Sequence, residues 1–426
     1  MTAGLDGRGR PVVVVTGVGV LTSLGEGVAD NWRALAAGRS GLRRISRFPL
    51  DGLRTTVAGT VDFVPLPEFS TPALSEEIAS RSIAEAVGMA GLGARGSFPG
   101  PLFLALPPVE LEWPQRRALA AASGATGTIT YADLLRAAGT GGFAATYERC
   151  LFASVGETLA ARFGTRGVPI EVSTACASGA TAIQLGVEAI RRGETDAALC
   201  VGTDASVNVE ALVRFSLLSA LSTRNDPPEG AARPFSKDRD GFVMAEGAGA
   251  LVLESLAHAR ARGAEILGVV EGCGERADSF HRTRSSPDGK PIIICMRRAI
   301  EDAGLAPEDI GYVNAHGTGT PENDKMEWHC LSEVFGARAG VVPVSSNKSM
   351  IGHTLSAAGT IEAVFTLLSL RHGLLPPTIN YDHPDPAVPI DCVPNVARAA
   401  DVAHALSNSF GFGGQNVALV LGREPA

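Results

Sequence analysis

Four side chains of this 426-residue sequence could carry out nucleophilic chemistry: Cys176, His316, Lys348 and His353. Cys176 lies in EVSTACASGATAIQLGVEAIRRG (171–193), where a short β-type run passes into small residues and then into a helical pattern. A sulfur at a helix N-terminus faces unpaired N–H groups, which favour the thiolate and can hold an oxyanion. On this stretch alone, a buried structural cysteine in an alanine-rich helix start remains the alternative.

The other three residues follow predicted strands in the second half of the chain. His316 stands in NAHGTGTP (314–321), and Lys348 and His353 stand in SSNKSMIGH (345–353). Taken singly, such a histidine or lysine is more often a hydrogen-bonded or solvated residue. Together with Cys176 they suit thioester chemistry: the thiolate accepts an acyl group, neutral imidazole N–H groups hold an enolate oxygen, and the lysine fixes a local charge.

Composition sets limits on the kind of protein. A chain of this length, 45% hydrophobic and 19% charged, is expected to form two core units. Its net charge of −8 argues against a nucleic-acid surface. Seven widely spaced cysteines without a CxxC pair favour neither disulfides nor a metal site, and no apolar run is long enough to span a membrane. We therefore expect a cytoplasmic protein.

The pattern of elements predicts an α/β fold. Continuous apolar runs at 12–16, 102–106, 197–202 and 341–345 are typical of buried strands, and amphipathic helical segments separate them. PIEVSTACASGA is echoed in the second half by VPVSSNKSMIGH, which suggests two similar halves whose strand ends share one site. We predict an N-terminal half over 11–270, with a capping insertion around 105–150, and a C-terminal half over 271–426.

Several motifs resemble the β-ketoacyl-acyl carrier protein synthases. They are STACASGA, LSTRNDPPEGAARPFSKDRDGFVMAEGAG, YVNAHGTGTPENDKMEW, VSSNKSMIGHTLSAAG, LPPTINYDHPDP and LSNSFGFGGQN. The chain is most similar to the elongating, synthase II-like type with a Cys-His-His site. The resemblance implies a thiolase-like fold, with two pseudo-equivalent α/β halves in a five-layered α-β-α-β-α arrangement. It also implies a homodimer, or a heterodimer with a second condensing-type subunit. The substrates would be carried on the phosphopantetheine of acyl carrier protein, with no further cofactor.

The resemblance also implies roles for single residues. Cys176 would take the acyl chain, His316 and His353 would promote malonyl decarboxylation and stabilise the enolate, and Lys348 would position the His353 loop. The backbone N–H groups of Cys176 and Phe412 would form the oxyanion hole, with Phe412 also gating the pockets. The remaining implied positions are Thr318, Thr320, Val109 and Phe410 as substrate-binding residues, Glu327 and Asp324 as ionic partners of Lys348, and Glu362 as a buried hydrogen-bond acceptor.

The first third departs from the family pattern. ALPPVELEW (105–113) replaces a glycine-rich segment, and we expect a longer acyl pocket near Val109 and a preference for long or unusual chains. LSEEIASRS (74–82), with Glu76 and Glu77, stands where a basic helix would dock the acidic carrier. Carrier docking would then fall to the arginines at 43, 44 and 47, or a different carrier or partner subunit is used.

The sequence thus predicts a decarboxylative Claisen condensation. An acyl-carrier-protein thioester and malonyl-acyl carrier protein would give a 3-oxoacyl thioester two carbons longer. Two alternatives remain open. One is a non-catalytic or partner-dependent chain-length subunit, although such subunits usually lack the cysteine. The other is a thiolase, although thiolases carry a second cysteine where this chain has GFGGQN (411–416).

Overall fold

The computed structural model describes residues 4–66, 69–93 and 96–423. Within them eleven strands form one mixed sheet, in the order β11-β10-β14-β15-β9-β1-β8-β7-β5-β6, with β2 beside β1. The strands are β1 (Val13–Thr22), β2 (Gly25–Glu26), β5 (Leu102–Ala105), β6 (Ile170–Val172), β7 (Ala197–Asp204), β8 (Gly247–Ser255), β9 (Gly268–Ala277), β10 (Ile310–Asn314), β11 (Val344–Ser345), β14 (His404–Phe410) and β15 (Gln415–Gly422). Two further pairs are β3 (Arg43–Arg44) with β4 (Val57–Ala58) and β12 (Leu374–Leu375) with β13 (Arg398–Ala399).

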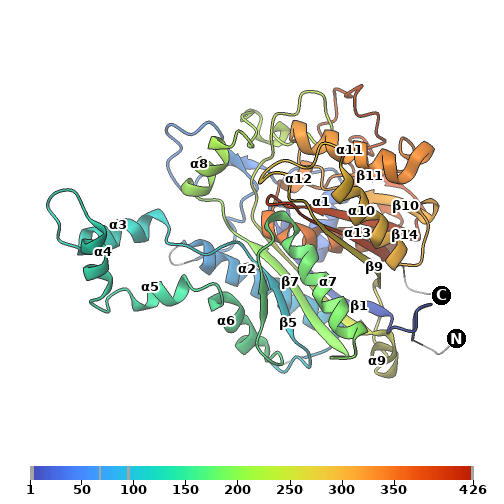
Figure 1. Cartoon of the computed structure of the whole chain (residues 1–426), viewed down its shortest axis with the longest axis horizontal. Helices are drawn as coiled ribbons and strands as arrows, with labels where there is room; N and C mark the ends of the chain where they lie inside the picture. Colours follow the sequence, from blue (N-terminus) through green and yellow to red (C-terminus); the bar gives the residue numbers. More distant parts are fainter. Residues whose placement is uncertain (1–3, 67–68, 94–95, 424–426) are drawn as a thin grey trace.

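Most of the helices lie on or between parts of this sheet, and three of them form an arm that projects from it (Figure 1). The helices are α1 (Val28–Ala36), α2 (Thr71–Ala90), α3 (Trp113–Ala122), α4 (Tyr131–Ala138), α5 (Ala144–Arg149), α6 (Ser154–Phe163), α7 (Ser178–Arg191), α8 (Val209–Leu217), α9 (Leu256–Ala261), α10 (Lys290–Asp302), α11 (Pro321–Phe335), α12 (Lys348–Ile351) and α13 (Ala358–His372). Two single 3₁₀ turns, η1 (Ala175–Ala177) and η5 (Leu355–Ala357), directly precede α7 and α13.

The sheet is built from the same five-strand unit twice. β6-β5-β7-β8-β1 forms the first half-sheet and β11-β10-β14-β15-β9 the second, with the same sequence of parallel and antiparallel pairs. The two units meet where β1 pairs antiparallel with β9, Val14 opposite Val269. Both halves of the predicted duplication are therefore present.

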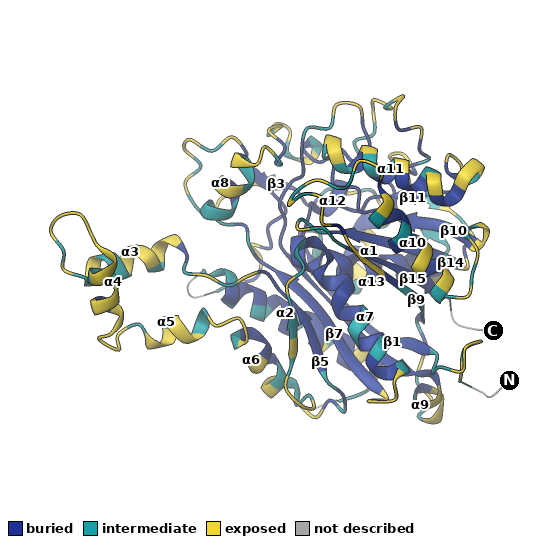
Figure 2. Ribbon diagram, viewed as in Figure 1, coloured by how far each residue is buried: buried dark blue, intermediate teal, exposed yellow. Residues whose placement is uncertain are grey.

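The two half-sheets enclose α7 and α13. The largest core cluster joins these two helices to β1, β7 and β8 on one side and to β14 and β15 on the other. Outside, α2 packs on the first half-sheet and α10 on the second, each through a separate core cluster. The central strands are buried on both faces (Figure 2), as their continuous apolar runs predict. The layers run α-β-α-β-α, and the predicted thiolase-like fold is confirmed.

The close contact of α7 with α13 corrects the internal alignment. A Cβ on Gly179 would lie 2.6 Å from the Thr360 nitrogen, and one on Gly359 would lie 2.3 Å from the Ala180 nitrogen. Each helix is thus pressed against the other at its own glycine. TACASG (174–179) therefore corresponds to TLSAAG (354–359) rather than to SNKSMIGH. The mismatch arises because the second half inserts residues 346–353 between strand and turn.

Residues 113–149 form an arm that extends away from the body (Figure 1). Helices α3, α4 and α5 of the arm bury one residue, Ala137, and most of their surface is exposed (Figure 2). The arm is tied to α2 through an ion pair of Arg149 with Glu76. We expected this insertion to cap the core, but its helices reach outward and leave large apolar side chains such as Tyr131 and Leu135 exposed. No helix in the described part of the chain is both long and apolar enough to cross a membrane.

Candidate active site

Cys176 lies in η1, between β6 and α7, at the strand-to-helix junction that the sequence predicts. The preceding Ala175 has a left-handed backbone, φ 50°, which turns the chain sharply before the nucleophile. The cysteine is 7% exposed and packs in a small apolar cluster with Phe242, Met244 and Leu355. The sulfur is therefore buried in an apolar pocket rather than presented on the surface.

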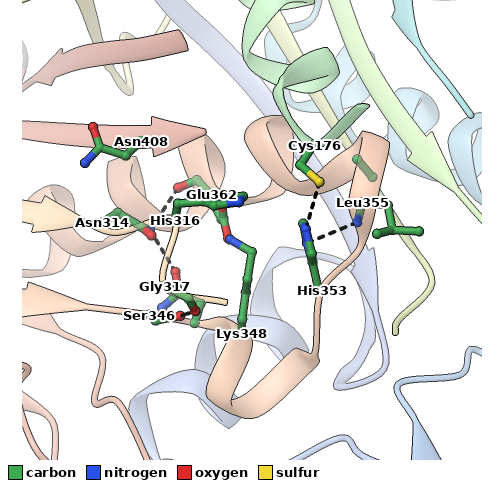
Figure 3. A network of polar contacts seen from close by, with 12 residues as sticks. Cys176, Asn314, His316, Gly317, Ser346, Lys348, His353, Leu355, Glu362 and Asn408 are labelled. Atoms are coloured by element: carbon green, nitrogen blue, oxygen red, sulfur yellow. Dashed lines mark hydrogen bonds and ion pairs between the residues drawn. The ribbon is translucent and has the colours of Figure 1, made fainter. Parts of the chain in front are cut away.

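His353 faces the cysteine sulfur (Figure 3). Its Nε2 lies 3.0 Å from Cys176 Sγ, and its Nδ1 accepts the backbone N–H of Leu355 at 3.3 Å. Since Nδ1 is an acceptor, the proton of the neutral imidazole sits on Nε2 and points at the sulfur. His353 is thus a hydrogen-bond donor at this site. The same tautomer disfavours Nε2 as a metal ligand, although the three Cys-His-His ligand atoms lie within 4.8 Å of one another.

His316 completes the cluster from the loop after β10. Its ring stands edge-on to that of His353 at a centroid distance of 5.4 Å, and Phe410 packs beside it at 5.5 Å. The buried carboxylate of Glu327, on α11, accepts the backbone N–H groups of His316 at 2.9 Å and Gly317 at 2.8 Å. Glu327 therefore fixes the backbone that carries the histidine.

Lys348 pairs with Glu362 of α13 (Figure 3), which confirms Glu362 as a buried hydrogen-bond acceptor but differs from the ion-pair partners predicted for the lysine. Both side chains are buried, with 2% and 1% of their surface exposed. Glu327 instead binds the His316 loop, and Asp324 accepts the N–H groups of Phe235 at 2.7 Å and Gly319 at 3.2 Å. The predicted ion pairs of Lys348 with Glu327 and Asp324 are wrong, because both carboxylates are used to hold loop backbone.

Burial and the positive charge of Lys348 act on the pKa of Cys176 in opposite directions. Burial raises the pKa of Cys176 to about 11, while Lys348 and a hydrogen bond from the Phe412 backbone act to lower it. Burial, followed by the charge of Lys348, holds the pKa of His316 and of His353 well below the ordinary value. The helix start therefore does not by itself give a low thiol pKa, contrary to our expectation. Both imidazoles are neutral at neutral pH and can donate N–H hydrogen bonds.

The remaining predicted residues lie at different distances from this cluster. The backbone N–H of Phe412 forms a hydrogen bond with Cys176, and its role as an oxyanion donor stays a prediction. The hydroxyls of Thr318 and Thr320 lie 2.9 Å apart in the loop that carries His316. Val109 packs against the outer cluster of α2, β5 and α6 and is not part of the apolar cluster around Cys176. Its role in the acyl pocket stays a prediction.

Three residues that matter here were missed by the sequence reasoning. Phe242 packs its ring edge-on against His353 at 5.4 Å, Leu355 fixes the tautomer of His353, and Asp204 is a fully buried carboxylate at the end of β7. Phe242 lies in a motif that had been singled out, GFVMAEGAG, and Asp204 ends a strand that had been predicted. Asp204 therefore carried a signal, since ligands gather at the carboxyl ends of strands, and Phe242 carried one through its motif.

The three arginines considered for carrier docking are not equivalent. Arg47 bonds the buried Glu246 at 2.6 Å and Asp62 at 2.8 Å, and it also stacks over Phe69. Arg43 donates to the Ser23 carbonyl at 2.7 Å. Arg44 is exposed. Arg47 is therefore committed to the fold, and its guanidinium is not free for a partner.

This fold and site define an acyl-transfer enzyme that works through a cysteine thiolate flanked by two neutral histidines. The chain belongs to the β-ketoacyl synthase family. Residues 10–80 and 114–259 match the description "Beta-ketoacyl synthase, N-terminal domain", and residues 267–382 match "Beta-ketoacyl synthase, C-terminal domain". The unmatched stretch 81–113 includes the segment that departs from the family pattern in the sequence.

Similar proteins include both fatty acid and polyketide enzymes. The chain is 38% identical to 3-oxoacyl-[acyl-carrier-protein] synthase 2 of Coxiella burnetii, over 96% of this chain and 98% of the relative. It is 38% identical to the tetracenomycin polyketide synthase ketoacyl synthase alpha subunit of Streptomyces glaucescens, over 96% and 97%. Among solved structures, a type II polyketide ketosynthase complex with its acyl-carrier protein superposes with a TM-score of 0.84 at 30% identity, covering 97% of this chain and 100% of that one.

The site geometry accounts for a condensing reaction. Cys176 Sγ attacks a thioester carbonyl, the bond from the acyl carbon to the carrier sulfur breaks, and the carrier thiolate leaves with the proton of the Cys176 thiol. When a malonyl group loses carbon dioxide, the electron pair of the broken bond passes to an enolate, whose oxygen can accept the Nε2–H of His353. The enolate carbon then attacks the acyl carbon, and the bond to Sγ breaks. The enzyme is an acyltransferase that forms a carbon–carbon bond.

Proposed function

We propose that this chain extends an acyl-acyl carrier protein by two carbons from malonyl-acyl carrier protein, through an acyl-Cys176 intermediate, in fatty acid or polyketide biosynthesis. One observation carries the proposal: Cys176 Sγ lies 3.0 Å from a His353 nitrogen that must carry a proton. That arrangement suits decarboxylation and enolate capture beside a nucleophile. A general base for the thiol would instead present a lone pair to it.

Substrate delivery requires no further cofactor in this proposal. The acyl and malonyl groups arrive on the phosphopantetheine arm of acyl carrier protein, and Thr318 and Thr320 contact that arm from the His316 loop. Of the arginines 43, 44 and 47, Arg44 is exposed and can meet an acidic carrier. We keep the preference for long or unusual acyl chains that residues 105–113 suggest.

We further propose that the chain works as a dimer. The arm exposes large apolar side chains that water does not favour, and the strand β6 at the sheet edge exposes Ile170. The most exposed large side chains of α3, α4 and α5 are Trp113 at 58%, Tyr131 at 75% and Tyr147 at 67%. Relatives of known structure include an ishigamide ketosynthase/chain length factor pair, with a TM-score of 0.82 at 35% identity over 98% of this chain and 100% of that one. The mass of the purified assembly distinguishes two copies from a pair with a second subunit.

A cytoplasmic location belongs to the same proposal. All seven cysteines are unpaired thiols, as in a reducing compartment.

The experiment that tests the proposal is acyl trapping. The purified chain is incubated with acyl-carrier thioesters of several lengths, with and without malonyl-carrier, and the mass of the Cys176 peptide is measured. We expect an acyl adduct in the wild type and in His316→Ala, no adduct in Cys176→Ala, and a 3-oxoacyl product in the wild type alone. If the wild type forms no acyl adduct on Cys176, either alone or together with any subunit that co-purifies with it, the proposal is overturned. A product that requires free coenzyme A would indicate a thiolase.

A further inference from the structure

The duplicated fold repeats the nucleophile turn in the second half. In TACASG (174–179) and TLSAAG (354–359), Cys176 corresponds to Ser356. Both turns are 3₁₀ and both begin at a left-handed residue, Ala175 with φ 50° and Leu355 with φ 46°. The N–H of Ser356 is therefore the counterpart of the N–H of Cys176.

The second oxyanion donor also has a counterpart. β7 and β14 occupy the same place in the two half-sheets, and they end at Asp204 and Phe410 respectively. Two residues beyond these ends stand Ser206 and Phe412. The N–H groups of Ser356 and Ser206 thus repeat, by the internal symmetry, the pair formed by Cys176 and Phe412.

This second pair of donors is filled from within the protein. Asp204 Oδ2 accepts the N–H of Ser356 at 3.0 Å and Asp204 Oδ1 accepts the N–H of Ser206 at 3.0 Å, and the side chain is fully buried. The hydroxyls of both serines also bond to the carboxylate. An anion held by four donors in a dry site is what an oxyanion hole is built to hold.

We propose that Asp204 occupies a second, non-reacting oxyanion hole and thereby acts as a positioning residue for His353. This inference rests on the proposed function. Ser356 directly follows Leu355, whose N–H sets the proton of His353 on Nε2. The carboxylate holds the Ser356 N–H and thereby keeps Leu355 in its left-handed conformation. In that conformation the Leu355 N–H is directed at Nδ1 of His353.

The charge of Asp204 has a separate, opposite effect on the nucleophile. Burial raises the pKa of Asp204 to about 6, so the carboxylate is ionised above neutral pH. Its negative charge raises the pKa of Cys176, as Glu362 does, while Lys348 opposes both. Removing the Asp204 charge should therefore make the thiol easier to ionise while it loosens His353. If Asp204 had a merely structural role, its substitution would lower both the alkylation rate of Cys176 and the decarboxylation rate.

The test compares Asp204→Asn and Asp204→Ala with Asp196→Asn, an exposed carboxylate at the opposite end of the β7 strand. Alkylation of Cys176 by iodoacetamide is followed at about pH 8, where the thiol is mostly protonated. Decarboxylation of malonyl-acyl carrier protein is measured in the same preparations. We expect Asp204→Asn to alkylate roughly 3–10-fold faster and to decarboxylate roughly 10–100-fold slower than the wild type. Asp196→Asn should change neither rate.

Added formate or acetate provides a second readout. In Asp204→Ala the vacated donors can bind a small carboxylate, which should restore decarboxylation in a saturable manner. In Asp204→Asn the amide fills the space, and no anion should restore activity. Nitrogen NMR of labelled histidine should show His353 protonated at Nε2 in the wild type and in both tautomers in Asp204→Asn.

The outcomes separate the inference from the function on which it rests. A folded Asp204→Asn that decarboxylates at the wild-type rate, or that loses alkylation and decarboxylation together, overturns the role of Asp204. If Asp204→Ala does not fold, the Asp204→Asn rates and the histidine tautomer still decide. A wild-type protein that never decarboxylates malonyl-carrier overturns the proposed function, and the alkylation and NMR results then still report on Asp204.

Discussion

Replacing Lys348 with methionine removes the positive charge that lowers the pKa of the nucleophile. Methionine is unbranched like lysine, is one atom shorter, and fills most of the same buried space. The change leaves the Glu362 carboxylate buried beside an apolar group, with 1% of its surface exposed. The variant should therefore affect two measurable quantities, the stability of the fold and the ionisation of Cys176.

The magnitudes follow from burial and from the thiol pKa. Removing one partner of a buried ion pair costs about 3–5 kcal/mol, so the free energy of unfolding should fall by that amount. A pKa of about 11 leaves roughly one thiol in 1,000 ionised at about pH 8. Loss of a nearby opposite charge raises such a pKa by about 1 unit or more, so alkylation at that pH should slow by roughly tenfold.

The histidines respond in the other direction. Lys348 holds the pKa of His316 and of His353 down, in addition to burial. Without the lysine charge both pKa values rise towards the ordinary value, and the imidazoles gain protons at a higher pH. Since decarboxylation needs neutral imidazoles, its acid limb should move to higher pH in Lys348→Met.

Urea denaturation, iodoacetamide alkylation against pH, and malonyl-carrier decarboxylation against pH measure these three effects. Lys325→Met, an exposed lysine on α11, is the matched control and should leave all three unchanged. The double variant Lys348→Met/Glu362→Leu should regain most of the lost stability and part of the alkylation rate, because the Glu362 charge that raises the pKa of Cys176 is removed as well. An alkylation profile of Lys348→Met that superimposes on the wild type would refute the electrostatic reasoning. A double variant no more stable than the single one would refute the account of the ion pair.

Two further predictions concern stability and docking. Gly359→Ala should destabilise the fold by about 3 kcal/mol or more, because its Cβ would stand 2.3 Å from the Ala180 nitrogen. Gly88→Ala has open space around it and should stabilise α2 by roughly 0.5–1 kcal/mol. Thermal unfolding measures both changes. Arg47→Ala should cost about 3 kcal/mol, since it leaves Glu246 buried and unpaired, and Arg44→Ala should raise the KM for acyl carrier protein without changing stability. Equal effects of the two arginine variants on KM would contradict this division.

The sequence was enough to predict the nucleophile Cys176 and most of the strands and helices around it, but not the ion-pair partner of Lys348. The β-branched run at 12–16 and the small residues after Cys176 were enough to predict a buried strand and a strand-to-helix turn. Lys348 was matched to acidic residues on α11, whereas its ion-pair partner is Glu362 on α13, which had been predicted only as a buried hydrogen-bond acceptor. That helix is buried on nearly all sides, so a lone glutamate among apolar residues was the available signal.

The raised thiol pKa was also outside the reach of sequence reasoning. A helix start next to Cys176 indicates a favourable dipole, but the pKa depends on how completely the apolar cluster of Phe242, Met244 and Leu355 excludes water. These residues come from the β8 region and from η5, and only the fold brings them to η1. Burial is therefore the dominant effect on the pKa of Cys176, and it outweighs the charge of Lys348 and the Phe412 N–H, which both lower that pKa.

The internal duplication explains why the site divides its work between the halves. Turns η1 and η5 pack against each other, and the first half places the Cys176 sulfur at this contact. The second half places there the residues that precede η5. Among them, the inserted residues 346–353 bring Lys348 and His353 to the sulfur. The turns lead into α7 and α13, whose close approach depends on the reciprocal contact of Gly179 with Gly359. A misplacement of about 1 Å in the site can reduce the rate by roughly 100-fold. The two glycines therefore set the separation of the helices that follow the two turns, although neither touches a substrate.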